Sequence, residues 1–330
     1  MTEVVEPKKK NKILWISILQ GFTMFLVVLG HSDLAQRENI AWLSEMYAFF
    51  ASFRMPLFLL VSGYLFYLTR IGKDRKYGDV MVDKLKRLGI PLVCFTIIGL
   101  GFKLLASSFV KNPVDFDGVQ DIFLMLLGLK PNALGAMWFL QITLLYMAFY
   151  PLYRVVLKNH VATLFVLLLF VLAYYFFPEG VDFMLISKAM KLGVFFFLGM
   201  VIGNYRLDNF LSAKPLALLL MVVIYVVCYI IGLQGLLLSV VGITMAMTFA
   251  KCAERYIPTL FSSFRNNTYQ IYLISVFPQM AVEMLFRKMG CEYFMPFFIV
   301  NVLVGLYFPI LVVLLVKKLD WKWVKAVIGL

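Results

Sequence analysis

A single histidine stands at the end of the first apolar segment, in the sequence LVVLGHSD, where its chemistry could serve catalysis. His31 follows Lys12 by 19 residues, so a helix rising about 1.5 Å per residue puts it roughly 28 Å along, near the outer boundary of a bilayer. Imidazole can take the proton of a hydroxyl near neutral pH, and the neighbouring carboxylate of Asp33 can fix its tautomer. The sequence predicts that His31 is a general base. The alternative is a histidine that only hydrogen-bonds a neighbouring helix or meets interfacial water.

Three other residues of the same segment, all on the N-terminal side of His31, form a stripe with it along one helix face. Eleven steps of about 100° return to within roughly 20° of the starting direction, so Gln20 and His31 share one helix face. Ser17 and Met24 belong to that face as well. Because hydrocarbon cannot satisfy hydrogen bonds, we expect the stripe to face the protein interior or a watery cavity. It predicts a path for substrate through the thickness of the membrane.

An arginine interrupts the second apolar segment, FFASFRMPLFLLVSGYLF. Arg54 lies about seven residues, or near 10 Å, inside the outer end of this segment, a depth comparable with that of His31. A central arginine costs some 2.5–3.5 kcal/mol to insert, so we expect Arg54 to face the helix bundle and an acceptor group. The alternative is a side chain that reaches back to the interface. Ser62 is either a substrate contact or, with Gly63, a small residue that allows close helix packing.

The composition requires a lipid environment for these elements. Of the 330 residues 62% are hydrophobic and 15% are charged, and the mean hydropathy is +0.89, more apolar surface than a soluble domain can bury. The net charge of +13 comes from Lys and Arg in short connections and near the ends, which is typical of membrane topology rather than of nucleic-acid binding. The four cysteines lack metal-ligand or redox spacing, so no metal site is expected.

The apolar segments predict an all-α, polytopic helix bundle that forms one domain over residues 1–330. We expect both termini in the cytoplasm, with residues 1–12 as a basic cytoplasmic tail, because basic residues concentrate in the segments assigned to that side. The protein would be multi-pass in the plasma (inner) membrane. A modest apolar stretch at 119–130 is either an outer-surface helix or a re-entrant piece. The expected membrane helices, about ten in number, lie near 13–33, 47–69, 88–109, 135–156, 161–177, 186–205, 215–232, 235–255, 268–287 and 294–316.

Four motifs in order along the chain carry a resemblance to a known family. They are LVVLGHS, SFRMPLFLLVSGYLF, KLKRLGIP and MWFL. Together they resemble the acyltransferase-3 family of membrane O-acyltransferases, particularly the branch of fucose 4-O-acetylases and surface-polysaccharide O-acetyltransferases. The resemblance is strongest over residues 13–95 and weaker at Met137 to Leu140, 195–203 and 267–275.

The resemblance implies an activity and two further site assignments. It implies transfer of an acyl group, usually acetyl, from cytoplasmic acyl-CoA to a hydroxyl of a surface glycan or its lipid-linked precursor. Acetyl-CoA would then be a donor substrate, and no bound cofactor is implied. The family's catalytic histidine falls on His31, and Arg54 falls where members carry Arg or His. Trp138 falls in the family's Trp-Phe-Leu segment, although an aromatic packed near the interface would look the same.

The sequence departs from the family pattern at two positions. Members commonly carry Arg or Lys eleven residues before the histidine, where this chain has Gln20, so a positive charge thought to assist the donor is missing. Many also carry a histidine where this chain has Ser275. These changes indicate either a subgroup with a different acceptor or a protein that kept the fold without the activity.

A mechanism follows from these assignments as a hypothesis. The donor phosphates would dock near Lys84, Lys86 and Arg87, although plain positive-inside topology also explains those charges. The acceptor hydroxyl would lose its proton to His31 and attack the thioester, with Arg54 stabilising the oxyanion. A route through an acyl-histidine is an alternative.

Two other functional classes are consistent with the sequence. A transporter or flippase for a carbohydrate or lipid-linked solute would also suit a bundle with a polar internal stripe. Coupled carriers usually place acidic groups inside the membrane, where this sequence offers chiefly Glu283, with Arg287 one turn later. A non-catalytic membrane partner in polysaccharide synthesis is the third class, and it requires neither His31 nor Arg54.

Overall fold

The computed structural model describes residues 13–32, 40–105, 115–180, 183–290 and 294–330, and within these ranges every regular element is helical. Short turns of other helix types join some of them, among them a π-helical turn at Leu85–Gly89 between α3 and α4. The α-helices in chain order are α1 (Leu14–Gly30), α2 (Ala41–Thr69), α3 (Tyr77–Lys84), α4 (Ile90–Leu105), α5 (Val119–Leu126), α6 (Trp138–Ala148), α7 (Tyr150–Val156), α8 (His160–Phe176), α9 (Ile186–Tyr205), α10 (Pro215–Ile230), α11 (Gly235–Tyr256), α12 (Thr268–Ile274), α13 (Val276–Lys288), α14 (Phe294–Lys318) and α15 (Lys322–Val327).

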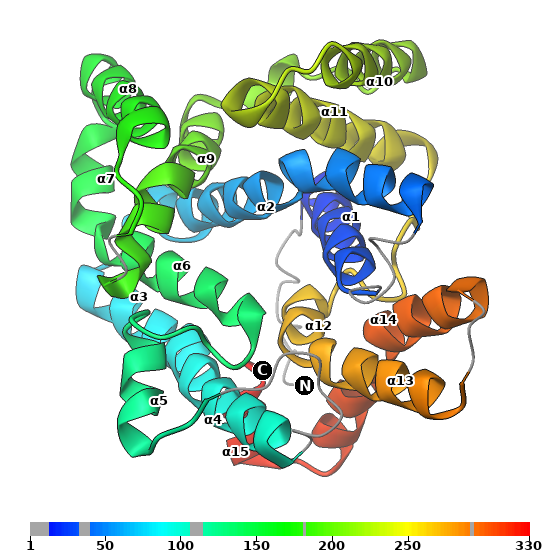
Figure 1. The fold of residues 1–330 in the computed structure, drawn as a ribbon. Helices are drawn as coiled ribbons and strands as arrows, with labels where there is room; N and C mark the ends of the chain where they lie inside the picture. The colour runs from blue at the N-terminus through cyan, green and yellow to red at the C-terminus, as the bar shows by residue number, and fades with distance from the viewer. Residues whose placement is uncertain (1–12, 33–39, 106–114, 181–182, 291–293) are drawn as a thin grey trace, which may run out of the picture.

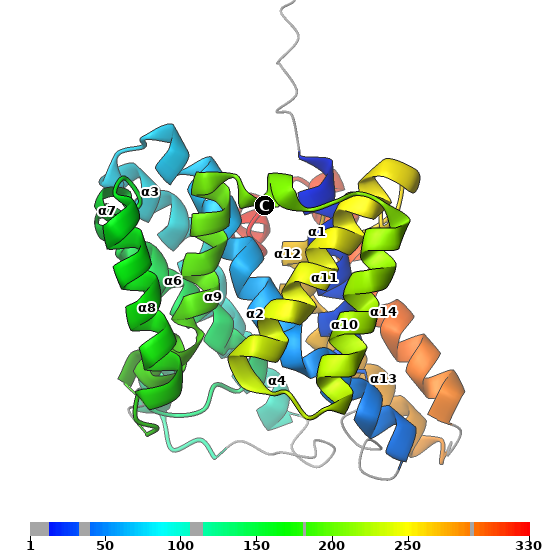
Figure 2. The same cartoon turned by 90° about the horizontal axis from the view of Figure 1, so that it is seen from above.

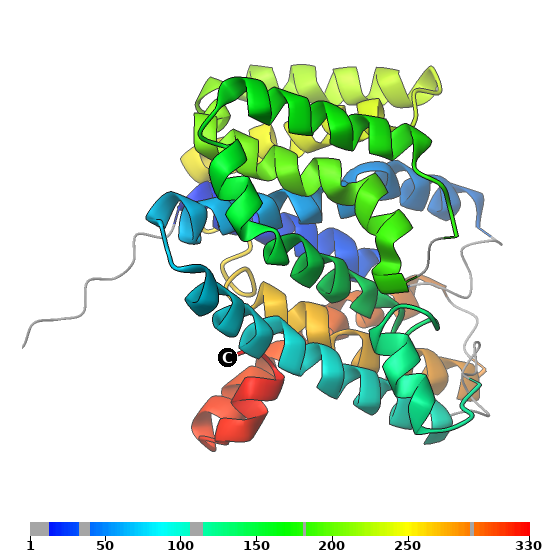
Figure 3. The ribbon, with the colours of Figure 1, turned by 90° about the vertical axis from the view of Figure 1, so that its left-hand side faces the viewer.

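The helices form one bundle with α1 and α2 near its middle (Figure 1). Helix α1 packs against α2, α11, α12 and α14, while α2 also packs against α9. Helices α8 and α10 lie on one face of the bundle and α15 lies on the opposite face (Figure 3). The first turn of α1, α3 and the C-terminus lie at the same end (Figure 2). We call this the basic end and the other, where α1 stops, the His31 end.

Several helices meet the length and apolarity that a membrane crossing requires. Five described segments do so, and the bent pair α6 and α7 makes a sixth if it counts as one span. Three shorter apolar helices, α1, α8 and α10, run in the same bundle. The chain is therefore a multi-pass membrane protein of the helical class, and each of the ten expected segments contains helix. The count of ten crossings and the orientation of the termini stay predictions.

Two proline residues free backbone carbonyls through which neighbouring helices attach. Proline lacks an N–H and leaves the carbonyl four residues earlier without its helical donor. Pro56 thereby frees the carbonyl of Ser52, which accepts a hydrogen bond from Ser239 Oγ of α11 at 2.6 Å. Pro91 likewise frees the carbonyl of Arg87, which accepts from the Tyr269 hydroxyl of α12 at 2.7 Å. Both contacts satisfy backbone groups that lipid cannot.

Two glycines allow α2 and α9 to touch backbone to backbone. A Cβ on Gly63 would lie 1.9 Å from the carbonyl oxygen of Phe196, and one on Gly199 would lie 2.1 Å from that of Leu60. No larger residue fits at either position without separating the helices. The close approach expected from the Ser62-Gly63 pair is confirmed for Gly63, and it fixes the position of α2 relative to the rest of the bundle.

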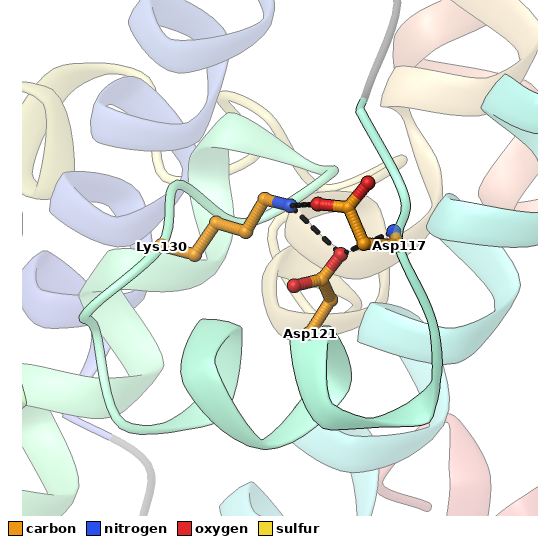
Figure 4. A network of polar contacts seen from close by, with 3 residues as sticks. All are labelled: Asp117, Asp121 and Lys130. Atoms are coloured by element: carbon orange, nitrogen blue, oxygen red, sulfur yellow. Dashed lines mark hydrogen bonds and ion pairs between the residues drawn. The ribbon is translucent and has the colours of Figure 1, made fainter.

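A charged cluster anchors α5 (Figure 4), which lies at the His31 end of the bundle (Figure 3). Asp121, in the first turn of α5, accepts from Lys130 Nζ at 2.7 Å and from the backbone N–H of Asp117 at 2.8 Å. Gln141 of α6 closes the other end of this short helix, because its Nε2 donates to the carbonyls of Met125 and Leu126. The expected stretch at 119–130 is thus a short helix, tied to the bundle by side chains.

Candidate active site

The last turn of α1 is held by donors from several parts of the chain. A helix ends with four carbonyls that lack intrahelical partners. The carbonyl of Leu29 accepts from the buried Tyr47 hydroxyl of α2 at 2.7 Å. The carbonyl of Val28 accepts from the backbone N–H of His31 at 3.1 Å and from Ser32 Oγ at 2.8 Å. His31, partly buried, therefore caps a helix end whose backbone is tightly bonded.

Arg54 lies directly beside this turn. Its Nη1 is 3.4 Å from the carbonyl oxygen of Leu26, and a Cβ built on Gly30 would fall 1.5 Å from the same nitrogen. The guanidinium thus occupies the space that the side chain of Gly30 would fill, next in sequence to His31. Helix α2 begins at Ala41, six residues before the expected 47, so Arg54 lies about 20 Å along it. The prediction that Arg54 faces the bundle at the level of His31 is confirmed.

A glutamine from the C-terminal third of the chain completes the contacts of this turn. Gln279 Nε2 of α13 donates to the Val28 carbonyl at 3.1 Å and to Ser32 Oγ at 3.0 Å. Asn301 Nδ2 of α14 donates to the backbone carbonyl of Gln279 at 3.3 Å, and both amides are almost fully buried. Gly305 permits this packing, since a Cβ there would lie 2.7 Å from Val28 and 2.9 Å from Gln279. Gln279 could not be predicted from the sequence, because no local pattern singles it out.

The polar stripe of α1 faces the protein, as predicted. Ser17 and Met24 are buried at 2% and 0% exposure. Gln20 lines a cavity of about 890 Å³ at the basic end. Lys86 and Arg87 of the π-helical turn line the same cavity, so the structure brings together three of the predicted binding residues. Gln20 and His31 are about 17 Å apart along α1, at 1.5 Å per residue.

Two further basic residues enter this cavity, Arg265 and Lys317. Arg265 packs on α1, since a Cβ on Gly21 would lie 3.0 Å from its own Cβ. Its Nη1 donates to the carbonyls of Pro258 and Leu260 at 2.7 and 2.8 Å, which uses two of the five N–H donors of a guanidinium. Arg265 could not be predicted from the sequence, because it lies in a connection between helices. The cavity therefore presents four basic side chains to a ligand, which suits an anion with several phosphates.

The remaining predicted residues have other neighbours. Lys84 Nζ lies 5.5 Å from the ring centroid of Phe66, while Lys188 Nζ lies 4.8 Å from that of Trp138. Ser62 donates to the carbonyl of Phe58 in its own helix at 2.9 Å. Asp33 lies outside the described residues.

An aromatic cluster connects the Trp138 segment to the Arg54 helix. Phe139, which follows Trp138, stacks on Phe58 with ring centroids 4.2 Å apart, and Tyr272 of α12 contacts both rings. Phe58 lies one helical turn after Arg54. These rings join α2, α6 and α12, so they fix the depth of Arg54 within the bundle. Within the described ranges, no three His, Cys, Asp or Glu side chains gather where they could hold a metal ion.

The chain also matches the profile of a known family over most of its length. The sequence profile of the acyltransferase-3 family, described as an acyltransferase domain, matches residues 13–323. The match spans nearly the whole chain, so the chain belongs to this family of membrane acyltransferases. No curated protein and no solved structure shows significant similarity to it.

Proposed function

We propose that the chain is a membrane O-acetyltransferase that moves an acetyl group from acetyl-CoA to a hydroxyl of a cell-surface glycan or its lipid-linked precursor. The observation that carries the proposal is the contact of Arg54 with Gly30, the residue that precedes His31 at the end of α1. Membership in an acyltransferase family supplies the reaction class. Acyl transfer to a hydroxyl would use His31 as the base and Arg54 as a fixed cation near the reacting carbonyl.

The basic cavity would receive the donor. Lys86, Arg87, Arg265 and Lys317 would contact its phosphates, and the pantetheine arm would extend along the polar face of α1 from Gln20 towards His31. Basic residues at this end also favour a cytoplasmic location for it, where acyl-CoA is available. Arg265 would provide the positive charge that Gln20 does not. Lys84, one turn before Arg87, stays a predicted contact that the cavity lining does not include.

At the other end of α1 the residues would perform the transfer. The acceptor hydroxyl gives its proton to the imidazole of His31, and its oxygen attacks the thioester carbonyl. Arg54 stabilises the negative charge that develops on the carbonyl oxygen. The carbon–sulfur bond then breaks, and the CoA thiolate takes the proton back from the imidazolium. The negative end of the α1 dipole stabilises that imidazolium while it exists.

The test uses purified protein in liposomes with acetyl-CoA labelled in the acetyl group. The acceptor is surface polysaccharide from the expressing cells, freed of O-acetyl esters by alkali. We expect alkali-labile label on the polysaccharide and a loss of about 10²- to 10⁴-fold in rate for His31→Ala. His160→Ala is the matched control, because the other histidine of the chain stacks on Tyr205 at the start of α8. Native rates in a correctly inserted His31→Ala protein would refute the assignment.

A further inference from the structure

We infer that Gln279 is a positioning residue, which holds the imidazole of His31 in register with the reacting groups through the carbonyl of Val28. This inference rests on the proposed function, because it assigns a task to Gln279 only if His31 is the base. The Val28 carbonyl accepts from the His31 N–H, and Gln279 Nε2 donates to that same oxygen. A single acceptor atom thus links the two residues.

The geometry leaves the amide of Gln279 few alternatives. Its side chain is 3% exposed, and its Nε2 divides its hydrogen bonds between Val28 and Ser32, the residues that flank the end of α1. Gly305 of α14 packs closely against the amide, since a Cβ built on Gly305 would fall 2.9 Å from the amide carbon. The amide therefore cannot swing away without moving α14 or the end of α1.

A second helix holds the backbone of Gln279 in turn. Asn301 Nδ2 donates to its carbonyl, so contacts run from α14 through α13 to the last turn of α1. Helix α13 starts after a break at Ser275, and Pro278 removes an N–H next to Gln279. The N–H of Gln279 itself donates to the Ser275 carbonyl at 3.2 Å, and the Asn301 contact adds a bond between helices to this one. Removing the Gln279 donor would let the His31 turn shift relative to Arg54.

Two variants separate positioning from plain stability. Gln279→Leu keeps approximate volume and removes both hydrogen bonds, and we expect kcat to fall about 10- to 100-fold with the KM for acetyl-CoA within about twofold. Gln279→Glu places an acid that donates to Val28 only while it is protonated. Its activity relative to the native protein should therefore rise as the pH is lowered from 8 to 5.5.

Gln141→Leu is the matched control. Gln141 is also a buried glutamine whose Nε2 donates to two carbonyls at a helix end, but that helix is α5. Its loss should lower thermal stability and leave kcat per folded molecule unchanged. All variants are assayed in liposomes with labelled acetyl-CoA and alkali-treated polysaccharide, alongside His31→Ala.

The outcomes distinguish a failure of the Gln279 inference from a failure of the proposed function. An inactive His31→Ala protein, together with a native kcat for Gln279→Leu or a flat activity ratio for Gln279→Glu, overturns the inference alone. An active His31→Ala protein overturns the proposed function and the inference with it. A fall in kcat with the rising low-pH ratio, and neither effect in Gln141→Leu, supports positioning.

Discussion

The carbonyl of Val28 accepts a hydrogen bond from Gln279, a residue 251 positions later in the chain. The same carbonyl accepts the N–H of His31. Helices α1 and α13 are therefore joined at the Val28 carbonyl oxygen, in the last turn of α1. Arg54 of α2 occupies the space beside Gly30 in the same turn. The candidate base thus lies where three separate parts of the chain meet, which makes its position sensitive to substitutions that do not touch substrate.

Gly30→Ala should displace the guanidinium of Arg54 without unfolding the protein. The added Cβ would fall 1.5 Å from Nη1, and a long, flexible side chain can move away from it. We expect the acetyl-transfer rate to fall about 10- to 100-fold, because the charge that stabilises the oxyanion moves. The measurement is kcat per folded molecule in liposomes. Gly101→Ala is the control, since nothing lies within 4 Å of a Cβ at that position of α4. Native activity in Gly30→Ala would show that the position of Arg54 is irrelevant.

Arg265→Gln should weaken the binding of acetyl-CoA and leave the rate of the transfer step nearly unchanged. The substitution removes one of the basic side chains of the cavity. Because the lost hydrogen bond is charge-assisted but partly screened by solvent, we expect the KM for acetyl-CoA to rise about 5- to 20-fold. The rise should shrink as salt is added, while kcat stays within about twofold. Arg255→Gln provides the comparison, because Arg255 lies against Tyr256 at the end of α11 and outside the cavity lining. Equal effects in the two variants would mean that general surface charge, and not the cavity, attracts the donor.

Much of this arrangement follows from local sequence. The segment 13–33 shows its polar stripe by periodicity alone, and an arginine inside an apolar run must face protein, as Arg54 does. Its partner could not be predicted, because Gly30 in LVVLGHS is one of 21 glycines, and only the packed bundle shows which of them leaves room for a guanidinium. The same holds for Gln279 and Arg265, whose contacts join segments far apart in the chain.

Two of the predicted membrane helices are each divided into two helices in the structure, and proline explains both divisions. The span expected at 135–156 bends by 57° between α6 and α7, since Pro151 cannot complete the helical hydrogen bond to Met147. The span at 268–287 divides at Ser275 into α12 and α13, since Pro278 cannot donate to the Ile274 carbonyl. Hydropathy averages over such breaks, so it predicts one straight helix where the chain forms two.

The α5 cluster should lose its order in acid. The hydrogen bond from Lys130 Nζ, aided by the Asp117 N–H, lowers the pKa of the Asp121 carboxyl. Because the folded value lies below the unfolded one of about 3.9, the stabilisation is complete above that pH and is lost as the pH falls through the folded pKa. Hydrogen exchange in residues 117–130, corrected for its intrinsic rate, should therefore accelerate below about pH 4. Asp121→Asn should exchange faster at neutral pH and show little further change in acid. Uniform protection down to pH 2 would contradict this account.

Ser239→Ala should destabilise the bundle through a carbonyl that proline leaves open. Pro56 cannot donate to the carbonyl of Ser52, and Ser239 Oγ meets that oxygen at 2.6 Å. Losing this bond between helices should cost about 1 kcal/mol in a denaturant titration of the protein in mild detergent. The decisive comparison is a double-mutant cycle with Pro56→Ala, because alanine restores an N–H that can bond to Ser52 within α2. In that background the loss caused by Ser239→Ala should shrink towards zero. If the two substitutions are additive instead, the hydroxyl does not compensate for the proline, and the attachment of α11 to α2 has another origin.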